Sequence, residues 1–418
     1  MHYFEYDDNN LYCEDVRVSD IVEDVGSPCY VYSYRTLIEH FRKLQSAFKP
    51  IDPLICYSVK ANSNLTICKA LVSEGAGLDV VSGGELFRAL KLKVDPEKIV
   101  FAGVGKTDQE IDAAIKAGIL FFNVESEAEL ERIQDLSVKK RKSVDVCLRV
   151  NPGVDPHTHK YIKTAKKESK FGLSFNVVRQ IMLHRERYFN VNIKGLHIHI
   201  GSQIVETKPY VQAIKKVLEF MKEIGKMGVE FEYLNIGGGM GIVYKKETAR
   251  TAKMFARAVL PLLKNTGLKI ILEPGRFIVG SAGILVSRVT YYKKTESKNF
   301  LIVDSGMNDL LRPSLYDAYH EIVPLHRRPH SKHRKHDIVG PICESGDFLA
   351  KDRMMPQVNS GEYLAVMCSG AYGFTMSSNY NSRLRPAEVL VKGDQFFVIK
   401  KRETYEDLIS GEKFPWFM

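Results

Sequence analysis

Four groups of reactive residues stand at the ends of apolar, strand-like segments of this chain. Lys60 ends LICYSVK, two histidines lie in LHIHIGS, three glycines follow EYLNI, and a glutamate and an arginine share LEPGR. Burial lowers the pKa of an amine, so a lysine at the rim of an apolar interior can form a Schiff base. An ordinary surface lysine is the simpler interpretation, but the position of Lys60 after an apolar run favours the reactive role.

The other groups could bind an anion and a flat, charged ring. The run Gly237–Gly239 would let backbone N–H groups approach a phosphate closely, and Ser202 could add a hydroxyl donor. A carboxylate such as Glu273 can keep a pyridine nitrogen protonated, which makes the ring a strong electron sink. Arg276 could then hold an anion. A flexible turn and an ordinary ion pair are the simpler interpretations of these residues.

His197 and His199 lie two residues apart and therefore share one face of a strand. A flat imidazole on that face could stack on a planar cofactor, although a histidine there is more often packed inside a barrel. The sequence leaves open whether His197 joins the site.

Eight strand-like runs alternate with helical segments between residues 54 and 273. They are LICYSVK, GLDVVS, IVFAG, ILFFNV, VDVCLRVN, IKGLHIHI, EYLNIG and KIILE. This content is typical of a (β/α)8 barrel, whereas a doubly wound sheet usually has about five or six strands. Residues beyond the C-terminal ends of barrel strands line the active site, so Lys60, His199, Gly238 and Glu273 should converge.

After Gly280 the pattern changes to strands without intervening helices, which predicts a second, all-β domain with a barrel or sandwich form. The early run CYVYSY is also strand-like, and we predict that it pairs with the C-terminal sheet. The chain is thus expected to be an α/β protein with a TIM-type barrel over residues 36–280. Residues 1–35 and 281–418 would form the β domain.

The composition is that of an ordinary globular protein, with 418 residues, 44% hydrophobic and 26% charged. No apolar stretch approaches the roughly 20 residues that span a bilayer, and the acidic N-terminus lacks a signal-peptide pattern. Seven scattered cysteines without a C-x-x-C pair argue against a disulfide framework or a zinc site. We therefore expect a cytoplasmic protein with no membrane partner and no metal.

A net charge of +10 raises the question of nucleic acid, but such binding needs the charge on one face. The positive charge is mostly dispersed, except for the stretch HRRPHSKHRKH at residues 326–336. We interpret this stretch as a solvated loop, because irregularly spaced histidines without acidic or thiolate partners rarely bind a metal. No nucleic-acid partner is expected.

Three loop-like segments of the β domain carry further reactive groups. RPSLY (312–316), CESGD (343–347) and GAYG (370–373) together offer a cation, a thiol, an acid and a phenol. A solvated arginine, a buried thiol and a glycine-flanked turn are the simpler interpretations of the three.

Taken in order, YSVKAN, HIHIGSQ, NIGGGMG, EPGR, LRPSLY, CESGD, GAYG and YNSRLRPAE resemble the diaminopimelate decarboxylase family. Each motif alone is weak, but eight in this order and spacing span nearly the whole chain. The resemblance implies the alanine-racemase-like fold and pyridoxal 5'-phosphate as cofactor. Two positions depart from the family pattern: Leu384 stands where proline is frequent and Ala165 where glycine is frequent.

The resemblance also assigns roles to individual residues. Lys60 would form the internal aldimine with pyridoxal phosphate, His199 would stack on the ring, and Glu273 would pair with the pyridine nitrogen. The phosphate region would contact Ser202, Gly238, Gly239, Gly275 and Arg276. The substrate would contact Arg276, Arg312, Tyr316, Glu344 and Tyr372, and Tyr372 would also contact the cofactor. Cys343 would donate the proton, which makes Lys60 and Cys343 the catalytic residues.

The implied reaction converts meso-2,6-diaminopimelate into L-lysine and carbon dioxide through an external aldimine, as the last step of lysine biosynthesis. The distal carboxylate of the substrate would meet Arg276, Arg312 and Tyr316, and its ammonium would meet Glu344. The family also implies a homodimer with shared active sites, in which Cys343 and Glu344 act on Lys60 of the partner subunit.

Two other functions stay open. The first is a decarboxylase of carboxynorspermidine, ornithine or arginine, although ornithine and arginine lack the second carboxylate that Arg312 would bind. The second is a non-catalytic pyridoxal-phosphate-binding protein. Such proteins are normally a single barrel without a domain like residues 281–418.

Overall fold

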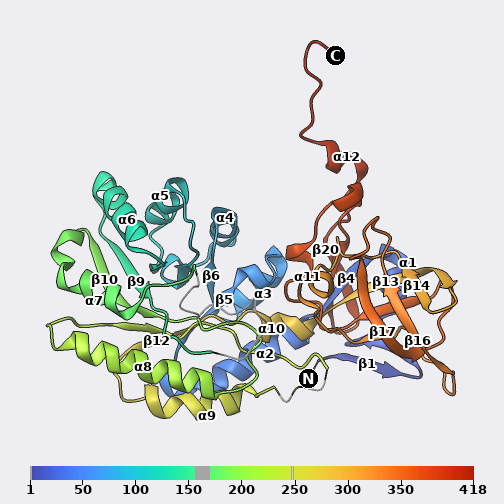
Figure 1. The fold of residues 1–418 in the computed structure, drawn as a ribbon, viewed down its shortest axis with the longest axis horizontal. Helices are drawn as coiled ribbons and strands as arrows, with labels where there is room; N and C mark the ends of the chain where they lie inside the picture. Colours follow the sequence, from blue (N-terminus) through green and yellow to red (C-terminus); the bar gives the residue numbers. More distant parts are fainter. Residues whose placement is uncertain (1, 156–169, 246, 248) are drawn as a thin grey trace. The chain divides into compact units, whose positions relative to one another are not determined.

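The computed structural model describes residues 2–155, 170–245, 247 and 249–418. These residues form two compact units (Figure 1). The barrel unit comprises Ile38–Val243 and Glu247–Ile278, and the sheet unit comprises Met1–Leu37, Tyr244–Lys246 and Val279–Met418. Ala165, one of the two departures from the family pattern, lies outside the described residues.

Eight parallel strands close the barrel in the order β10-β11-β12-β5-β6-β7-β8-β9. Their bounds are β5 (Leu54–Ser58), β6 (Gly77–Val80), β7 (Ile99–Phe101), β8 (Phe121–Val124), β9 (Val144–Arg149), β10 (Val191–His197), β11 (Tyr233–Asn235) and β12 (Lys269–Leu272). Each strand overlaps one of the eight runs predicted from the sequence. The predicted barrel is therefore confirmed.

Helices follow the strands and lie outside the barrel (Figure 1). They are α3 (Leu65–Ser73), α4 (Gly83–Lys91), α5 (Asp108–Ala117), α6 (Glu127–Lys140), α7 (Phe175–Leu183), α8 (Lys208–Gly225) and α9 (Ala252–Leu263). Most begin at a side chain that accepts a hydrogen bond from the first turn: Asn64, Ser82, Thr107, Ser126, Ser174 and Thr251. Such caps fix where each strand-to-helix loop ends.

Side chains from five of the barrel strands pack together in the barrel interior. Cys56, Val100, Phe121, Cys147 and Ile271 form one buried apolar cluster. Burial raises the pKa of the Cys56 and Cys147 thiols well above the usual value, so both are unreactive packing groups. Because this apolar layer fills the barrel interior, the reactive polar side chains are expected at the strand ends.

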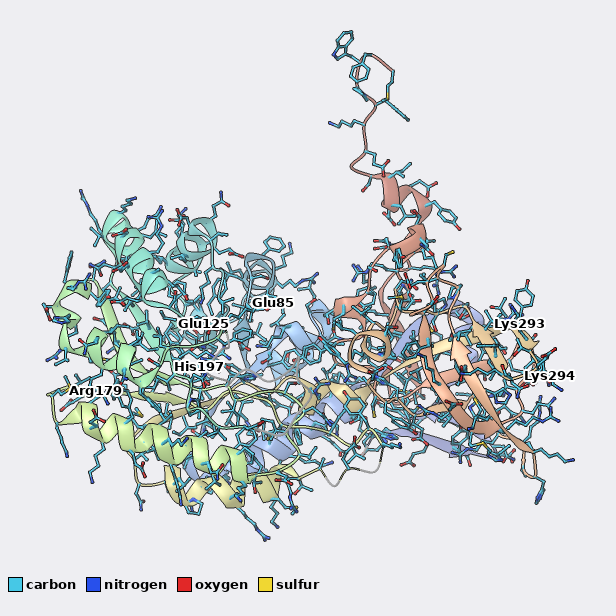
Figure 2. All side chains as sticks on the ribbon, viewed as in Figure 1. Glu85, Glu125, Arg179, His197, Lys293 and Lys294 are labelled. Carbon is cyan, nitrogen blue, oxygen red and sulfur yellow. The ribbon has the colours of Figure 1, made fainter. Side chains whose placement is uncertain are left out.

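The sheet unit is built on a long sheet with the order β17-β16-β14-β13-β4-β19-β20, and β18 and β15 extend from β13. The bounds are β4 (Cys29–Ser33), β13 (Gly283–Lys294), β14 (Asn299–Val303), β15 (Ile322–Pro324), β16 (His333–Val339), β17 (Phe348–Pro356), β18 (Tyr363–Val366), β19 (Ala387–Lys392) and β20 (Gln395–Lys400). The predicted all-β region is thus present. Figure 2 shows Lys293 and Lys294 at the solvent-facing end of β13.

The early run behaves as the sequence predicts. β4 pairs antiparallel with β13 and parallel with β19, so the N-terminal segment contributes a central strand to the C-terminal sheet. Buried Val31, Val286 and Val389 pack in one apolar cluster beside this junction. Helix α1 (Val18–Val25) adds Val18, Ile21 and Val22 to that cluster.

Several elements have no counterpart in the sequence-based expectation. A small sheet at the N-terminus contains β1 (Phe4–Asp7), β2 (Asn10–Cys13) and β3 (Val16–Arg17). Strands β15 and β17 were also not predicted. Helix α2 (Tyr34–Phe48) and the short helices α10 (Arg276–Val279), α11 (Arg312–Tyr316) and α12 (Tyr405–Ile409) complete the fold.

The expectation that residues 326–336 form a loop is only partly right. Residues 333–336 begin β16, where His333, Arg334, Lys335 and His336 pair with residues 353–356 of β17. His336 is buried, and the preceding side chains are exposed. The stretch was misjudged because exposed basic side chains on a strand, here one between β17 and β14, cannot be distinguished by composition from a solvated loop.

Within the residues that the structure describes, no helix has both the length and the apolar character required to cross a bilayer.

Candidate active site

Lys60 lies in a single 3-10 turn, Val59–Ala61, directly after β5. Its Nζ donates to Oδ2 of Asp79 at 2.7 Å. The Lys60 side chain keeps 32% of its surface exposed, whereas Asp79 is fully buried. The amine therefore stands at the barrel mouth, held over a buried carboxylate on the neighbouring strand β6.

Asp79 is a site residue that the sequence analysis missed. Ser58 Oγ donates to Asp79 Oδ2 at 2.7 Å and lies 3.0 Å from the backbone oxygen of Glu273. Burial raises the pKa of Asp79, and the Lys60 amine opposes that rise. Oδ1 of Asp79 is buried without a hydrogen-bond partner in the described part of the chain. An acid inside the apolar run GLDVVS was the sequence signal for this residue.

A second acid, Glu85, lies in the first turn of α4. Its Oε2 accepts a hydrogen bond from the backbone N–H of Val81 at 2.8 Å. Burial raises the pKa of Glu85 to about 7, against the opposing effects of that hydrogen bond and of Lys60. Glu85 can therefore change its charge near neutral pH, within electrostatic range of Lys60 and Asp79.

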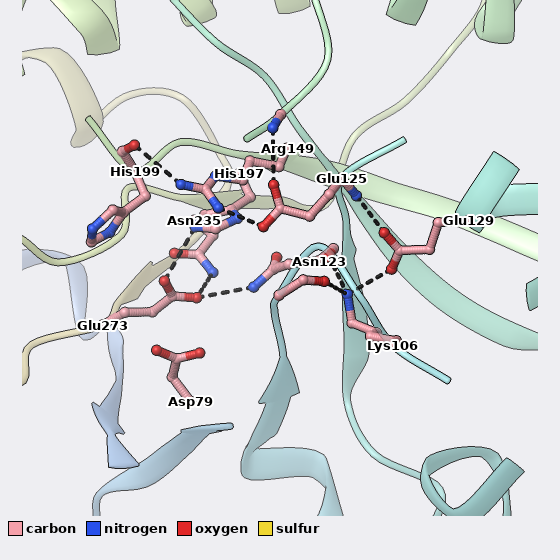
Figure 3. A network of polar contacts seen from close by, with 12 residues as sticks. Asp79, Lys106, Asn123, Glu125, Glu129, Arg149, His197, His199, Asn235 and Glu273 are labelled. Atoms are coloured by element: carbon pink, nitrogen blue, oxygen red, sulfur yellow. Dashed lines mark hydrogen bonds and ion pairs between the residues drawn. The ribbon is translucent and has the colours of Figure 1, made fainter. Parts of the chain in front are cut away.

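Glu273 follows β12 and is the centre of a buried polar network (Figure 3). Its Oε1 accepts from Asn123 Nδ2 at 3.0 Å and from Asn235 Nδ2 at 2.6 Å. Its Oε2 lies 3.1 Å from Nε2 of His197. Burial by itself raises the pKa of Glu273, but the His197 ring, the Lys60 amine and the Asn235 amide outweigh burial and hold that pKa well below its usual range. The carboxylate is therefore ionised.

The two histidines occupy different positions in this network. His197 is the last residue of β10 and contacts Glu273. His199 lies beyond the strand, half-buried, and its Nδ1 is 3.3 Å from the backbone nitrogen of Gly238. Burial, the Arg149 guanidinium and the Lys60 amine hold the pKa of His199 well below its usual range. The ring of His199 is therefore neutral.

A second set of charges supports the far side of the network (Figure 3). Arg149 forms an ion pair with Glu125, and its other terminal nitrogen donates to the backbone oxygen of His199 at 3.4 Å. Lys106, almost fully buried, donates to Glu129 at 2.6 Å and to the backbone oxygen of Asn123 at 2.9 Å. These residues were not predicted, since each is an ordinary charged residue in the sequence. Their hydrogen bonds hold the backbone of His199 and Asn123 in place.

The glycine run adopts a backbone that side chains would block. Gly237 and Gly239 have φ values of +68° and +95°, which favour glycine. A Cβ on Gly238 would overlap the backbone oxygen of Glu273, and one on Gly275 would lie 2.9 Å from the Cβ of Ala61. The chain can therefore approach β12 and β5 closely, and the N–H groups of Gly237 and Gly238 point to Asn235 Oδ1 and His199 Nδ1.

Ser202 and Arg276 lie beside the glycines in the same unit. An Arg276 guanidinium nitrogen donates to Ser202 Oγ at 3.0 Å. Tyr210 of α8 donates to the backbone oxygen of Gly238 at 2.8 Å, which anchors the glycine run to a helix. Hydroxyl, guanidinium and backbone N–H donors in one place are the donor set that a phosphate requires.

Lys60, His199, Ser202, Gly238, Gly239, Glu273, Gly275 and Arg276 thus all belong to the barrel unit and gather at its strand ends. The remaining predicted site residues belong to the sheet unit: Arg312, Tyr316, Cys343, Glu344 and Tyr372. Arg312 is buried at the start of α11, whereas Cys343 and Glu344 are exposed. Tyr372 has a φ of +57°, a left-handed conformation.

The loop that carries Cys343 is pinned in place. Asp347 accepts from the backbone N–H groups of Met307 at 2.6 Å and Ile342 at 2.7 Å. The backbone N–H of Cys343 donates to Asn381 Oδ1 at 2.7 Å. The exposed thiol is therefore held on an ordered loop.

The groups at the barrel strand ends are those that binding of pyridoxal phosphate requires. An amine at the barrel mouth can hold the aldehyde, a backbone cradle that any Cβ would fill can hold the phosphate, and an ionised buried carboxylate can pair with a protonated ring nitrogen. The neutral ring of His199 lies beside the glycine run, with Nδ1 3.3 Å from the backbone nitrogen of Gly238.

The model of the family described as pyridoxal-dependent decarboxylase, pyridoxal binding domain, matches residues 34–280. The chain is 47% identical to the diaminopimelate decarboxylase of Aquifex aeolicus, over 98% of this chain and 97% of that protein. It is 45% identical to that of Haemophilus influenzae, over 99% of both.

Solved structures agree with these relatives. Diaminopimelate decarboxylase from Helicobacter pylori complexed with L-lysine has a TM-score of 0.90 and 39% identity, with 94% of this chain and 98% of that chain covered. The enzyme from M. jannaschii in co-complex with L-lysine has a TM-score of 0.93 and 36% identity, with 99% and 98% covered.

Proposed function

The chain belongs to the diaminopimelate decarboxylases of the pyridoxal-dependent decarboxylase family, and from that membership we propose that it converts meso-2,6-diaminopimelate into L-lysine and carbon dioxide. The choice of substrate rests on one observation: the structures of two relatives that match nearly the whole chain have been solved with L-lysine bound. L-Lysine is what remains of that substrate after one carboxyl group is lost. The reaction is the lysine-forming step of amino-acid biosynthesis.

Bound pyridoxal phosphate supplies an electron sink for the pair left behind when the carboxyl group leaves. Lys60 would hold the cofactor through its amine, and Asp79 Oδ2, which accepts a hydrogen bond from that amine at 2.7 Å, would position it. Ionised Glu273 would keep a proton on the ring nitrogen, and His197 and the two asparagine amides hold Glu273 in place. The neutral ring of His199 would contact the cofactor ring.

The phosphate is proposed to bind at the N–H groups of Gly238, Gly239 and Gly275, with Ser202 and Arg276. Gly238 lies close to the backbone of Glu273, so the glycine turn packs against the strand end that bears the carboxylate. Tyr372 is proposed to contact both cofactor and substrate.

We propose that the enzyme recognises the carboxylate and the ammonium group at the distal carbon centre of the substrate. The distal carboxylate would contact Arg276, Arg312 and Tyr316, and the distal ammonium group would contact Glu344. A substrate without the distal carboxylate would leave buried donors unpaired, which costs affinity. Cys343 is proposed to return a proton to the carbon that has lost carbon dioxide.

We also propose that the enzyme is a cytoplasmic homodimer with shared sites. The exposure of Cys343 and Glu344 on a pinned loop suits residues that complete the site of a second chain. Buried thiols such as Cys13 and Cys29, whose pKa burial raises, suit a reducing compartment.

Subunit sharing predicts complementation between variants. Lys60→Ala and Cys343→Ala should each be nearly inactive alone, but unfolding and refolding them together should restore roughly a quarter of the wild-type rate. Half of the dimers formed at random are mixed, and each mixed dimer has one intact site of two. Carbon dioxide release measures the recovery. Mixing Lys60→Ala with Glu273→Gln is the control, because both changes lie in the barrel and no site is repaired; equal recovery in the two mixtures would contradict sharing.

The substrate proposal is tested by steady-state carbon dioxide release from purified protein with added cofactor. We expect kcat/KM for meso-diaminopimelate to exceed those for ornithine and arginine by about 10⁴-fold, because they lack the distal carboxylate. Carboxynorspermidine is the harder competitor and belongs in the same panel. Faster turnover of any of the three would replace the proposed substrate, and cofactor binding without carbon dioxide release from any would indicate a carrier.

A further inference from the structure

A buried histidine, His320, lies next to Arg312 in the sheet unit. Arg312 Nη1 lies 2.9 Å from Nε2 of His320, and Nδ1 of His320 lies 2.8 Å from the backbone oxygen of Met367. His320 has no exposed surface, and Arg312 is 5% exposed. Neither the motifs nor the family comparison assigns His320 a role.

The proton positions on His320 follow from its two neighbours. A guanidinium can only donate, so Nε2 must present its lone pair to Arg312. A carbonyl oxygen can only accept, so the proton is on Nδ1 and points to Met367. The ring is therefore the neutral tautomer with its hydrogen on Nδ1, assigned from its hydrogen-bond partners.

The ring is anchored to the sheet on both sides. The backbone N–H of Met367 donates to the oxygen of Glu321 at 2.8 Å, next to the β15–β18 pairing of Ile322 with Val366. Arg353 donates to the backbone oxygen of His320 at 2.7 Å. Backbone and side chain of His320 are thus fixed by separate hydrogen bonds, so the position of Nε2 is set by the sheet.

A second contact orients the guanidinium itself. Arg312 Cζ lies 4.7 Å from the centroid of the Tyr244 ring, and the Tyr244 and His320 rings meet edge to face at 5.3 Å. An arginine stacked on one face and tethered at one nitrogen has little rotational freedom left. Its remaining N–H donors point in fixed directions.

Because the His320 ring is neutral, it does not reduce the positive charge of the Arg312 guanidinium. A carboxylate at the position of His320 would cancel the charge of Arg312, as in an ordinary buried ion pair. A neutral imidazole positions the guanidinium while adding no negative charge of its own. Since the affinity of a guanidinium for a carboxylate depends on that charge, a neutral His320 does not itself weaken the binding of a ligand carboxylate to Arg312.

We propose that His320 is the positioning residue that makes Arg312 a selective receptor for the distal carboxylate of the substrate. This role for His320 rests on the proposed function, which places that carboxylate on Arg312. It adds to the proposed function that substrate selectivity also depends on His320, a residue that does not contact the substrate. Tyr244 assists by covering one face of the guanidinium.

The test compares two ligands that differ in one carboxylate. L-Lysine carries the distal carboxylate and cadaverine lacks it, and both are measured as competitive inhibitors of the holoenzyme. In His320→Asn the amide can still donate to Met367 but does not reach Arg312. We expect L-lysine to bind roughly 10-fold to 100-fold more weakly, cadaverine to be unchanged, and KM for meso-diaminopimelate to rise more than kcat falls.

His320→Gln and His320→Glu form a matched pair that differs only in charge. Gln can offer an oxygen to Arg312 and should restore much of the lysine preference, whereas Glu should weaken lysine more than Asn does. This pair carries the test even if His320→Asn fails to fold, and thermal melting checks each variant. An unchanged lysine-to-cadaverine ratio in all folded variants would overturn the proposal.

The two hypotheses fail differently in this experiment. If the wild type does not decarboxylate meso-diaminopimelate, or binds cadaverine as well as L-lysine, the proposed function or its use of Arg312 is wrong. If the wild type behaves as proposed and Gln and Glu at position 320 give the same ratio, only the role of His320 is wrong.

Discussion

Replacing Lys60 with alanine should reduce kcat for meso-diaminopimelate by at least about 10³-fold and remove the imine absorption of the holoenzyme. The contact of the Lys60 amine with buried Asp79 at 2.7 Å fixes its position. Alanine removes the group that holds the cofactor aldehyde. Absorbance titration with pyridoxal phosphate and carbon dioxide release measure the two effects.

The matched control for this change is Lys222→Ala, which removes an exposed lysine from the last turn of α8. Its rate and its absorption should equal those of the wild type. Lys60→Ala also leaves Asp79 buried without its amine, so thermal melting is needed to show that the variant is folded. A folded Lys60→Ala protein that keeps the parental rate would end the assignment of this active site.

The barrel could be predicted from the sequence because its signals are local. Each parallel strand is buried on both faces and appears as a short apolar run, such as LICYS before Lys60, and capped helices separate the runs. Strands β1–β3 and β17 gave no such signal. β17 contains Lys351, Asp352 and Arg353 among its apolar residues, and a half-exposed strand of this kind is recognised only when its pairing with β16 is known.

The site was predictable only where one residue type is itself diagnostic. Lys60 and the glycine run stand out because an amine at a strand end or three consecutive glycines are unusual. Asn123 and Asn235 do not stand out, since an asparagine in an apolar run has no specific chemistry. Their role depends on barrel closure, which brings β8 and β11 to the same carboxylate across 112 residues of sequence, the difference between positions 123 and 235.

The role of His320 could not be predicted from the sequence either. In the sequence it is one histidine after LRPSLY, and nothing there distinguishes it from the histidines of the basic stretch at residues 326–336. Only its burial and its two hydrogen bonds, to Arg312 and to Met367, show that it is neutral and oriented. Charge state and direction are properties of the fold, so composition cannot supply them.

The second large effect is expected for Glu273→Gln. The glutamine side chain has nearly the same shape and can still accept from Asn123 and Asn235, but it carries no charge to hold a proton on the cofactor nitrogen. We expect kcat to fall by about 10²-fold to 10³-fold, with a smaller change in cofactor affinity. Glu223→Gln is the control: it removes a surface ion pair with Arg179 and should leave kcat unchanged.

The same variant has a signature in the pH dependence of stability. His197, Lys60 and Asn235 outweigh burial and lower the pKa of Glu273, so its ionised form stabilises the fold above the unfolded-state pKa of about 4.3. That stabilisation is lost as the pH falls toward the lower, folded-state pKa. The apo wild type should therefore melt above Glu273→Gln at pH 7, and the difference should shrink in acid. A difference that instead grows as the pH falls would mean that Glu273 is protonated in the folded protein, and it could not then hold a cofactor proton.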